Sequence, residues 1–173
     1  LMQAVWGKAK STGEGKEPDE RDTTKFELNL SYDKVSFPQP MRGPRLDAES
    51  LKGKVFLYVY WSPEVSAAPT ILGKLQSWHD ELSDLGLVVA VSNVEEVPQL
   101  AKVEEIAKDR KTEFTILEQT FLTGKHEFPM PHGVLFDHEG TCIFRGSPLA
   151  CETVMRSTVA KLLLQALGKK SFV

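Results

Sequence analysis

The stretch that decides the fold is KVFLYVYW at residues 54–61, which is followed by SPEVSAAP at residues 62–69. The first segment is rich in β-branched and aromatic residues, a composition typical of a strand that is covered on both faces. Ser62 and Pro63 end this strand. We therefore predict a buried central strand over residues 54–61, with a loop leading away from its end.

A helix is predicted directly after this loop. Apolar residues recur at helical spacing over residues 68–85, Ser66 is a suitable N-cap, and Pro69 falls in the first turn, where its missing amide would have had no partner. Gly86 ends the helix, and the apolar run at residues 87–91 predicts a second buried strand. Two strands joined by a helix of this length form a βαβ unit.

Further elements are predicted on the C-terminal side of this unit. In order they are a helix from about Asn93 to Arg110, a short strand at 114–117, a hairpin at 134–145 and a final helix at 152–167 that Gly168 closes. Leu100 and Ala166 are expected on the inward faces of the two helices.

The N-terminal part of the chain has a different character. Residues 1–25 combine glycines with mixed charges and are typical of an arm, so we expect the domain to span residues 26–173. Apolar residues alternate with polar ones over residues 26–32, which predicts a half-buried strand in an extension that covers residues 26–45.

Composition excludes two classes of function. The 173 residues carry 21 Lys and Arg against 24 Asp and Glu, a net charge of −3, so no positive surplus exists to bind nucleic acid. The longest apolar run, at residues 55–61, is far shorter than the roughly 20 residues of a membrane span. Two cysteines, Cys142 and Cys151, form neither a disulfide framework nor a zinc or CxxC pair.

The order of the elements and two motifs resemble the TlpA- and ResA-like (redoxin) branch of the thioredoxin-like proteins. The motifs are LKGK followed by VFLYVYW at residues 51–61 and FPMPHGVLFDHEG at residues 128–140. The resemblance covers about residues 46–167. It implies an α/β fold of three layers, in which helices flank a central mixed sheet, with an N-terminal extension. It also implies a cis bond before Pro131 and an extracytoplasmic or organellar location.

The sequence departs from this family in the loop that should carry its chemistry. The CxxC positions fall at Val65 and Ala68, so both sulfur atoms are replaced by hydrocarbon. Dithiol chemistry requires a thiolate of low pKa at a helix N-terminus and a second sulfur that resolves the mixed disulfide. Cys142 and Cys151 are predicted to be structural, Cys151 being the better candidate for a lowered pKa. We therefore predict no catalytic residue and a redox-inactive domain.

The resemblance also implies a groove in which a partner would lie. Its expected residues are Trp61, Glu64, Val65, Met130, Pro131 and His132. Met130 would present its backbone edge to an extended peptide, a mode that needs no sulfur. Trp61 and Val65 are expected to leave an apolar patch at the mouth of the groove. The predicted role is a protein-binding or assembly module whose partner is a protein or peptide.

Three alternatives remain open at this point. Glu64 and His132 would form an acid–imidazole pair for general acid–base catalysis. The chain would otherwise be an oxidoreductase-family protein of non-standard activity, or a piece of a larger protein that begins before Leu1. His126, His132 and His138 lie within one short segment, but without thiols we predict no metal and no cofactor.

Overall fold

The computed structural model describes residues 2–3, 29–96, 99–122 and 130–171. In chain order the elements of these residues are β1 (Met2–Gln3), α1 (Ala48–Leu51), β2 (Val55–Trp61), α2 (Ala68–Leu82), the 3-10 turn η2 (Ser83–Leu85), β3 (Leu87–Asn93), α3 (Leu100–Asp109), β4 (Thr115–Glu118), β5 (Thr120–Phe121), β6 (His132–Phe136), β7 (Cys142–Gly146), η3 (Pro148–Ala150) and α4 (Glu152–Ser171). The predicted arm at residues 1–25 lies outside the described residues, apart from β1.

The main sheet has the strand order β4-β3-β2-β6-β7. β2, β3 and β4 run parallel, whereas β6 runs antiparallel to both β2 and β7. The register places Trp61 beside Asn93, and Asn93 beside Glu118. The carboxyl ends of three parallel strands therefore meet at one edge of the sheet, where open α/β sheets bind their ligands.

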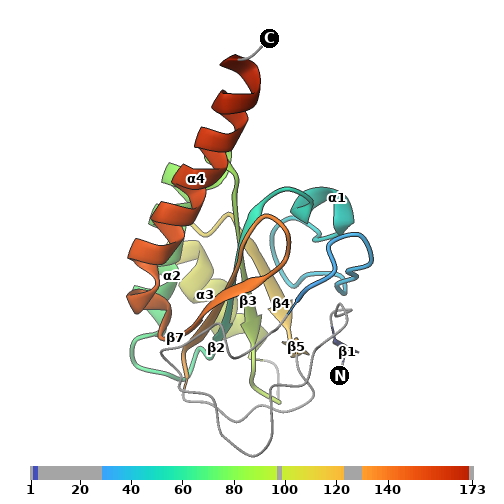
Figure 1. Ribbon diagram of the computed structural model, residues 1–173. Coiled ribbons are helices and arrows are strands. Elements are labelled where there is room, and N and C mark those ends of the chain that lie inside the picture. Colours follow the sequence, from blue (N-terminus) through green and yellow to red (C-terminus); the bar gives the residue numbers. More distant parts are fainter. Residues whose placement is uncertain (1, 4–28, 97–98, 123–129, 172–173) are drawn as a thin grey trace, which may run out of the picture.

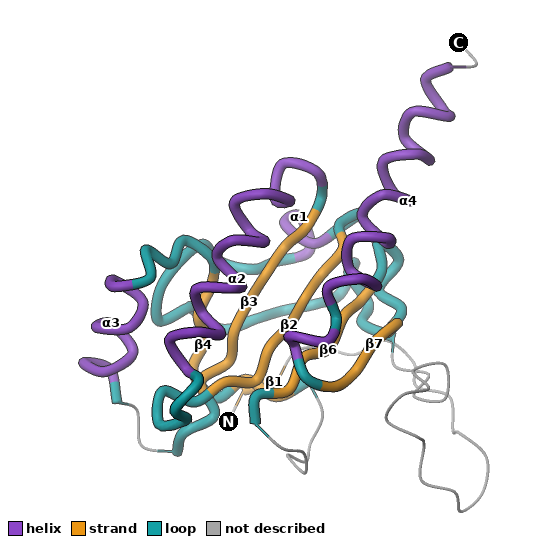
Figure 2. The backbone as a smooth tube through the Cα atoms, turned by 90° about the vertical axis from the view of Figure 1, so that its left-hand side faces the viewer, coloured by secondary structure: helices purple, strands orange, loops and turns teal. Residues whose placement is uncertain are grey.

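Strand β2 lies in the middle of the sheet, and all of its residues are buried. Its odd-numbered side chains belong to a core shared with α2, α3 and α4. Its even-numbered side chains belong to a second core shared with residues 30–51. The three helices thus cover one face of the sheet and the N-terminal segment with α1 covers the other, as Figures 1 and 2 show. The predicted mixed sheet in a three-layer α/β fold is confirmed.

The predicted strand at residues 26–32 can be compared only over residues 29–32, because residues 26–28 lie outside the described residues; residues 29–32 form no named strand. Within the described part of the N-terminal extension, the backbone pairs at two isolated bridges, Asn29 with Thr141 and Arg42 with Ile116. Leu30 and Tyr32 are nonetheless buried, and the Tyr32 hydroxyl donates to the carbonyl of Asp137 at 3.0 Å. The alternation of apolar residues correctly predicted that Leu30 and Tyr32 are buried. Burial of alternate side chains does not by itself require the backbone hydrogen bonds of a strand.

Helix α2 matches the prediction except at its cap. Pro69 lies in the first turn as expected, and Gly86, with φ of 111°, follows η2. The positive φ favours glycine at this position, and a Cβ atom there would lie 2.9 Å from Leu162 Cδ2, so the Leu162 side chain would have to move. The N-cap is Ala67 instead of Ser66, and no side chain accepts a hydrogen bond there.

Helix α3 begins later than predicted. Asn93 ends β3 because the pairing with β4 keeps the backbone extended to this residue. Its side-chain oxygen accepts a hydrogen bond from the Glu95 amide at 3.2 Å, so it caps a turn instead of a helix. Val103 and Ala107 face the core, but Leu100 is 56% exposed and does not face inward as expected.

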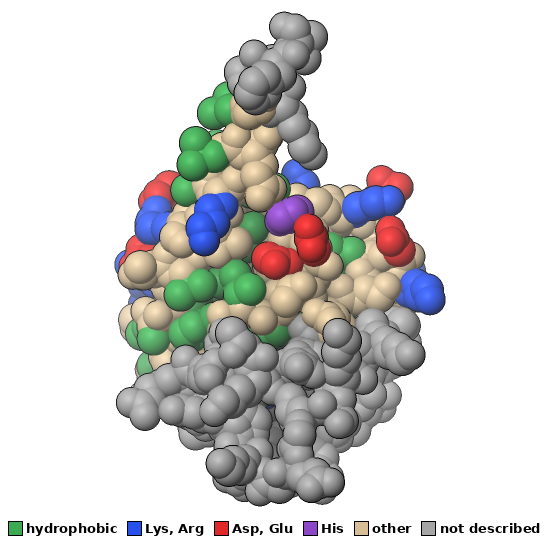
Figure 3. Space-filling view, viewed as in Figure 1, with side chains coloured by type: hydrophobic (Ala, Val, Ile, Leu, Met, Phe, Trp, Pro, Cys, Tyr) green, Lys and Arg blue, Asp and Glu red, His purple; other side chains and the backbone are tan. Residues whose placement is uncertain are grey.

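Helix α4 is longer than predicted, because it continues through Gly168 to Ser171. Met155 and Val159 pack in the core, whereas residues 164–167, including Ala166, are exposed. The last turns project beyond the sheet (Figure 1), and hydrophobic side chains line this part of the helix in the space-filling view (Figure 3). No helix within the described residues is both long and apolar enough to cross a membrane.

Candidate functional site

The loop after β2, residues 62–68, is held by a set of short-range hydrogen bonds. The Val65 amide donates to the Ser62 carbonyl at 3.3 Å, and the Ala68 amide donates to the Val65 carbonyl at 2.9 Å. Ser62 is buried; its hydroxyl donates to the Glu95 carboxylate and accepts from the Glu64 amide at 3.1 Å. This network fixes the loop to the segment that follows β3 and defines where α2 begins.

Val65 and Ala68 occupy two distinct environments in this loop. Val65 is half-buried at the surface, whereas Ala68 is 1% exposed at the first position of α2. The arrangement has one accessible position and one buried position three residues later, at the leading end of a helix. Neither side chain contains an atom that forms a disulfide, so the loop itself cannot perform dithiol exchange.

The two cysteines do not supply the missing sulfur. Cys142 belongs to the core beneath the N-terminal segment and Cys151 to the core beneath the helices, so they lie on opposite faces of the sheet. Both are free and buried. Burial raises the pKa of the Cys142 thiol to about 11 and that of the Cys151 thiol to about 12. Cys151 was the better candidate for a lowered pKa, but its pKa is raised, because desolvation by burial outweighs the helix N-terminus.

Trp61 is a core residue and forms no part of an exposed patch. Its side chain is 1% exposed, and its indole Nε1 donates to the Ala68 carbonyl at 3.1 Å. Trp61 points to the helical face because it has the same parity along β2 as Val55 and Leu57. The expected patch at the mouth of the groove therefore lacks its largest member, and Trp61 instead anchors the start of α2.

The segment before β6 contains the expected backbone feature. The peptide bond between Met130 and Pro131 is cis, and both residues are half-buried. His132 follows as the first residue of β6 and is 6% exposed. Its ring stacks on Tyr60 at 6.4 Å between centroids, and Arg145 Nε lies 3.4 Å from His132 Nε2.

Glu64 and His132 are not brought together. Glu64 reaches Lys102 of α3, with 3.2 Å between carboxylate and ammonium, on the helical side of the sheet. His132 packs on the Tyr60 ring, which faces the opposite side. Among the described residues, no group of three or more His, Cys, Asp or Glu side chains has an arrangement that would hold a metal ion. His126 lies outside the described residues.

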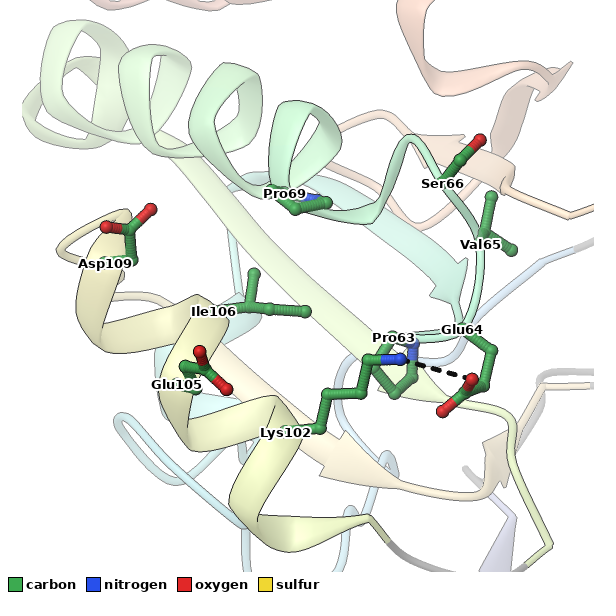
Figure 4. A pocket seen from close by; sticks show the side chains of 9 residues that line it. All are labelled: Pro63, Glu64, Val65, Ser66, Pro69, Lys102, Glu105, Ile106 and Asp109. Carbon is green, nitrogen blue, oxygen red and sulfur yellow. Dashed lines mark ion pairs between the residues drawn. The ribbon is translucent and has the colours of Figure 1, made fainter.

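A groove instead joins the loop to α3, and we call it the α3 groove. Residues 63–66 and Pro69 form one side, and Lys102, Glu105, Ile106 and Asp109 of α3 form the other. Its volume is about 440 Å³. Ile106 projects from α3 toward the loop, and the Glu64–Lys102 ion pair crosses one end (Figure 4).

Sequence reasoning identified the loop side of this groove but not the α3 side. From the sequence alone, Lys102, Glu105 and Asp109 indicate only the solvent-exposed face of an amphipathic helix. The signal that would have found them is topological, because the segment leading to α3 leaves the carboxyl end of β3, which pairs with the carboxyl end of β2 at Trp61 and Asn93.

Comparison with known proteins identifies the architecture. No family model matches the chain, and no curated protein matches it in sequence. A thiol-disulfide isomerase from Corynebacterium glutamicum has a similar structure, with a TM-score of 0.57 at 13% identity over 72% of this chain and 92% of that one. A secreted Mycobacterium tuberculosis disulfide oxidoreductase, homologous to E. coli DsbE, is also similar. Its TM-score is 0.52 at 17% identity, and the match covers 64% of this chain and 81% of that one.

A third similar structure is the thioredoxin domain of a thiol-disulfide oxidoreductase from Bacteroides vulgatus, with a TM-score of 0.51 at 15% identity over 64% of this chain and 83% of that one. Identities this low show a shared fold. The protein therefore has a thioredoxin-like fold, with Val65 and Ala68 in the segment where β2 leads into α2.

Proposed function

We propose that this protein is a thioredoxin-like binding module without dithiol–disulfide activity. The observation that carries the proposal is the placement of sulfur: the loop before α2 holds Val65 and Ala68, while both thiols are buried on opposite faces of the sheet. A buried thiol of raised pKa provides neither a nucleophile nor access to another protein's disulfide.

A binding role is favoured because the surface around the loop contains a groove, although the loop lacks the two thiols that dithiol exchange requires. The α3 groove opens beside Val65, and the half-buried Met130 and Pro131 lie at the start of β6. An extended peptide would lie along Met130 by backbone pairing, as edge-strand addition does elsewhere. The proposed partner is therefore a protein that offers an extended segment.

We propose an extracytoplasmic location as well. The similar protein from Mycobacterium tuberculosis is described as secreted, and the resemblance of the sequence to TlpA- and ResA-like proteins points the same way. Fractionation of cells that express the full gene product tests this proposal. Recovery only with the cytoplasm contradicts it.

The redox half of the proposal is tested by equilibrating the protein with glutathione buffers of decreasing reduction potential. Thiols that remain free are then alkylated, and the intact mass is measured. We expect both thiols to stay free at every potential, because the two sulfurs cannot meet. An intramolecular disulfide between Cys142 and Cys151, formed while the protein stays folded, would overturn the proposal.

The binding half is tested by NMR titration with reduced, carboxymethylated α-lactalbumin as an extended, disulfide-free probe. We expect the amide resonances of the 62–68 loop and of Met130 to shift on addition. Resonances that do not move, or that move only along α4, would contradict the proposed binding surface.

A further inference from the structure

The α3 groove has an apolar floor. Pro63, Val65 and Pro69 on the loop side face Ile106, which is half-buried and packs against the helical core. A volume of about 440 Å³ falls in the range of ligand-binding clefts, which runs from roughly 300 to 1,000 Å³. The space suits a few side chains of a peptide.

The charges of the groove are unbalanced. Glu64 and Lys102 neutralise each other at 3.2 Å, which leaves Glu105 and Asp109 as the remaining charged groups of the lining. Asp109 lies 3.6 Å from Arg110, its neighbour in sequence, and is 73% exposed. Glu105 is exposed and has no hydrogen bond or ion pair to any described residue. With Asp109 paired to Arg110, the unpaired charge beside the apolar floor is the carboxylate of Glu105, and it is negative.

The two carboxylates occupy one wall. Glu105 and Asp109 are four residues apart on α3, so they lie on the same side of the helix, with Ile106 beside them. Figure 4 shows Ile106 between the two carboxylates and the loop. A ligand that fills the groove would thus meet hydrocarbon on the loop side and carboxylate oxygens along α3.

We infer that the α3 groove binds an extended segment of a partner protein in which an arginine or lysine follows or precedes an apolar side chain. The apolar side chain lies on Val65, Pro69 and Ile106, and the cation lies against Glu105 and Asp109. Arginine fits this arrangement well, because its guanidinium makes bidentate contacts to carboxylates and its stem covers apolar surface. This inference rests on the proposed binding function and names the chemistry of its partner.

The experiment selects peptides from a phage-displayed library of random heptapeptides on the full chain. Enriched sequences are synthesised, and their affinities are measured for the wild type and for the double variant Glu105→Gln/Asp109→Asn. Both substituted residues are exposed and make no core contact, so the fold should persist; circular dichroism checks this. The matched control is Glu49→Gln/Asp84→Asn, which removes two carboxylates from exposed positions of α1 and η2.

We expect the enriched peptides to share a basic residue beside an apolar one. Their affinity should fall roughly fivefold in the groove variant, since each exposed ion pair contributes modestly, and should not change in the control variant. The affinity for the wild type should also fall with rising salt. A variant that carries Glu105→Lys should lose the binding altogether.

Three results would overturn the inference. They are the absence of enriched peptides, enrichment of peptides without a basic residue, and affinities that the groove variant leaves unchanged. If the selected peptides instead shift the amide resonances of Met130 and His132, the binding function stands and the assignment to the α3 groove fails. The redox half of the proposed function is decided separately by the glutathione equilibration.

Discussion

Cys142 and Cys151 show how strongly local environment decides the chemistry of a residue. Cys151 directly precedes α4, a position that favours a thiolate, yet it is fully buried and its thiol pKa is raised. The prediction that both cysteines are structural agrees with their burial, whereas the direction of the pKa shift of Cys151 depends on the packing of α4 against the sheet. The same holds for Trp61, whose place beside the loop suggested a surface role.

Thiol accessibility is the first prediction at this scale. We expect both cysteines of the native protein to react with Ellman's reagent at least about 100-fold more slowly than a free cysteine at pH 8, since a pKa near 11 lowers the thiolate fraction by that factor. Both should react rapidly in concentrated guanidinium chloride. The control is Val65→Cys, which places a thiol at the half-buried loop position and should react quickly in the native state. Fast reaction of the wild type would contradict the assignment.

Trp61→Ala is the second prediction. We expect this variant to lower the free energy of unfolding by about 3–5 kcal/mol, because it removes a buried aromatic side chain and its hydrogen bond to Ala68. Urea denaturation measures the change. Leu149→Ala, at a residue that is 49% exposed, should change the stability by no more than about 0.5 kcal/mol. A Trp61→Ala protein of native stability would show that this side chain is not a core anchor.

At the scale of elements, the sequence correctly predicted those helices and strands whose residues alone determine their structure. β2 follows from an unbroken β-branched and aromatic run, and the β6–β7 hairpin from two apolar runs around Asp137 and Gly140. Over residues 29–32, the described part of the predicted strand at 26–32, the alternation of apolar residues indicated burial but not a strand, because a segment that covers a sheet buries the same side chains as a strand. The start of α3 was misplaced because pairing with β4 decides where β3 ends.

The two halves of α4 give the third prediction. Met155 is fully buried and Leu164 is 67% exposed, although both are apolar residues of one helix. We expect Met155→Ala to destabilise the protein by about 2–5 kcal/mol and Leu164→Ala to change it by less than about 0.5 kcal/mol. Thermal unfolding of the two variants makes the comparison. Equal losses would mean that the projecting turns pack against the domain.

At the scale of the whole molecule, the candidate site is formed by elements that are distant from one another in the chain. The loop after β2, helix α3 and the segment before β6 meet only because of the strand order β4-β3-β2-β6-β7. The resemblance predicted a central mixed sheet, and with it the loop and Met130. It did not predict the acidic wall of the α3 groove, since only the fold places Glu105 and Asp109 opposite the loop.

Stability at alkaline pH is the fourth prediction, and it belongs to the whole molecule. Burial raises the pKa of both thiols and of the hydroxyls of Tyr32, Tyr58 and Tyr60. The folded state therefore holds protons that the unfolded state releases, and stability is complete below about pH 9, where the unfolded thiols begin to ionise. We expect the free energy of unfolding to fall steadily from pH 9 to pH 11.

Urea denaturation across this range tests the sign and the origin of the effect. The variant Cys142→Ala/Cys151→Ala should lose stability less steeply with pH than the wild type, because two of the titrating groups are gone. Stability that stays flat to pH 11, or equal slopes for the two proteins, would contradict the burial of the thiols.

The most direct measurement of the central claim is reduction of insulin by dithiothreitol in the presence of the wild type and of Val65→Cys/Ala68→Cys. We predict that the wild type gives no rate above the uncatalysed reaction, because the loop carries no sulfur. The double variant should accelerate the reaction, since it places one half-buried and one buried thiol at the leading end of α2. Catalysis by the wild type that disappears when Cys142 or Cys151 is replaced would contradict the account.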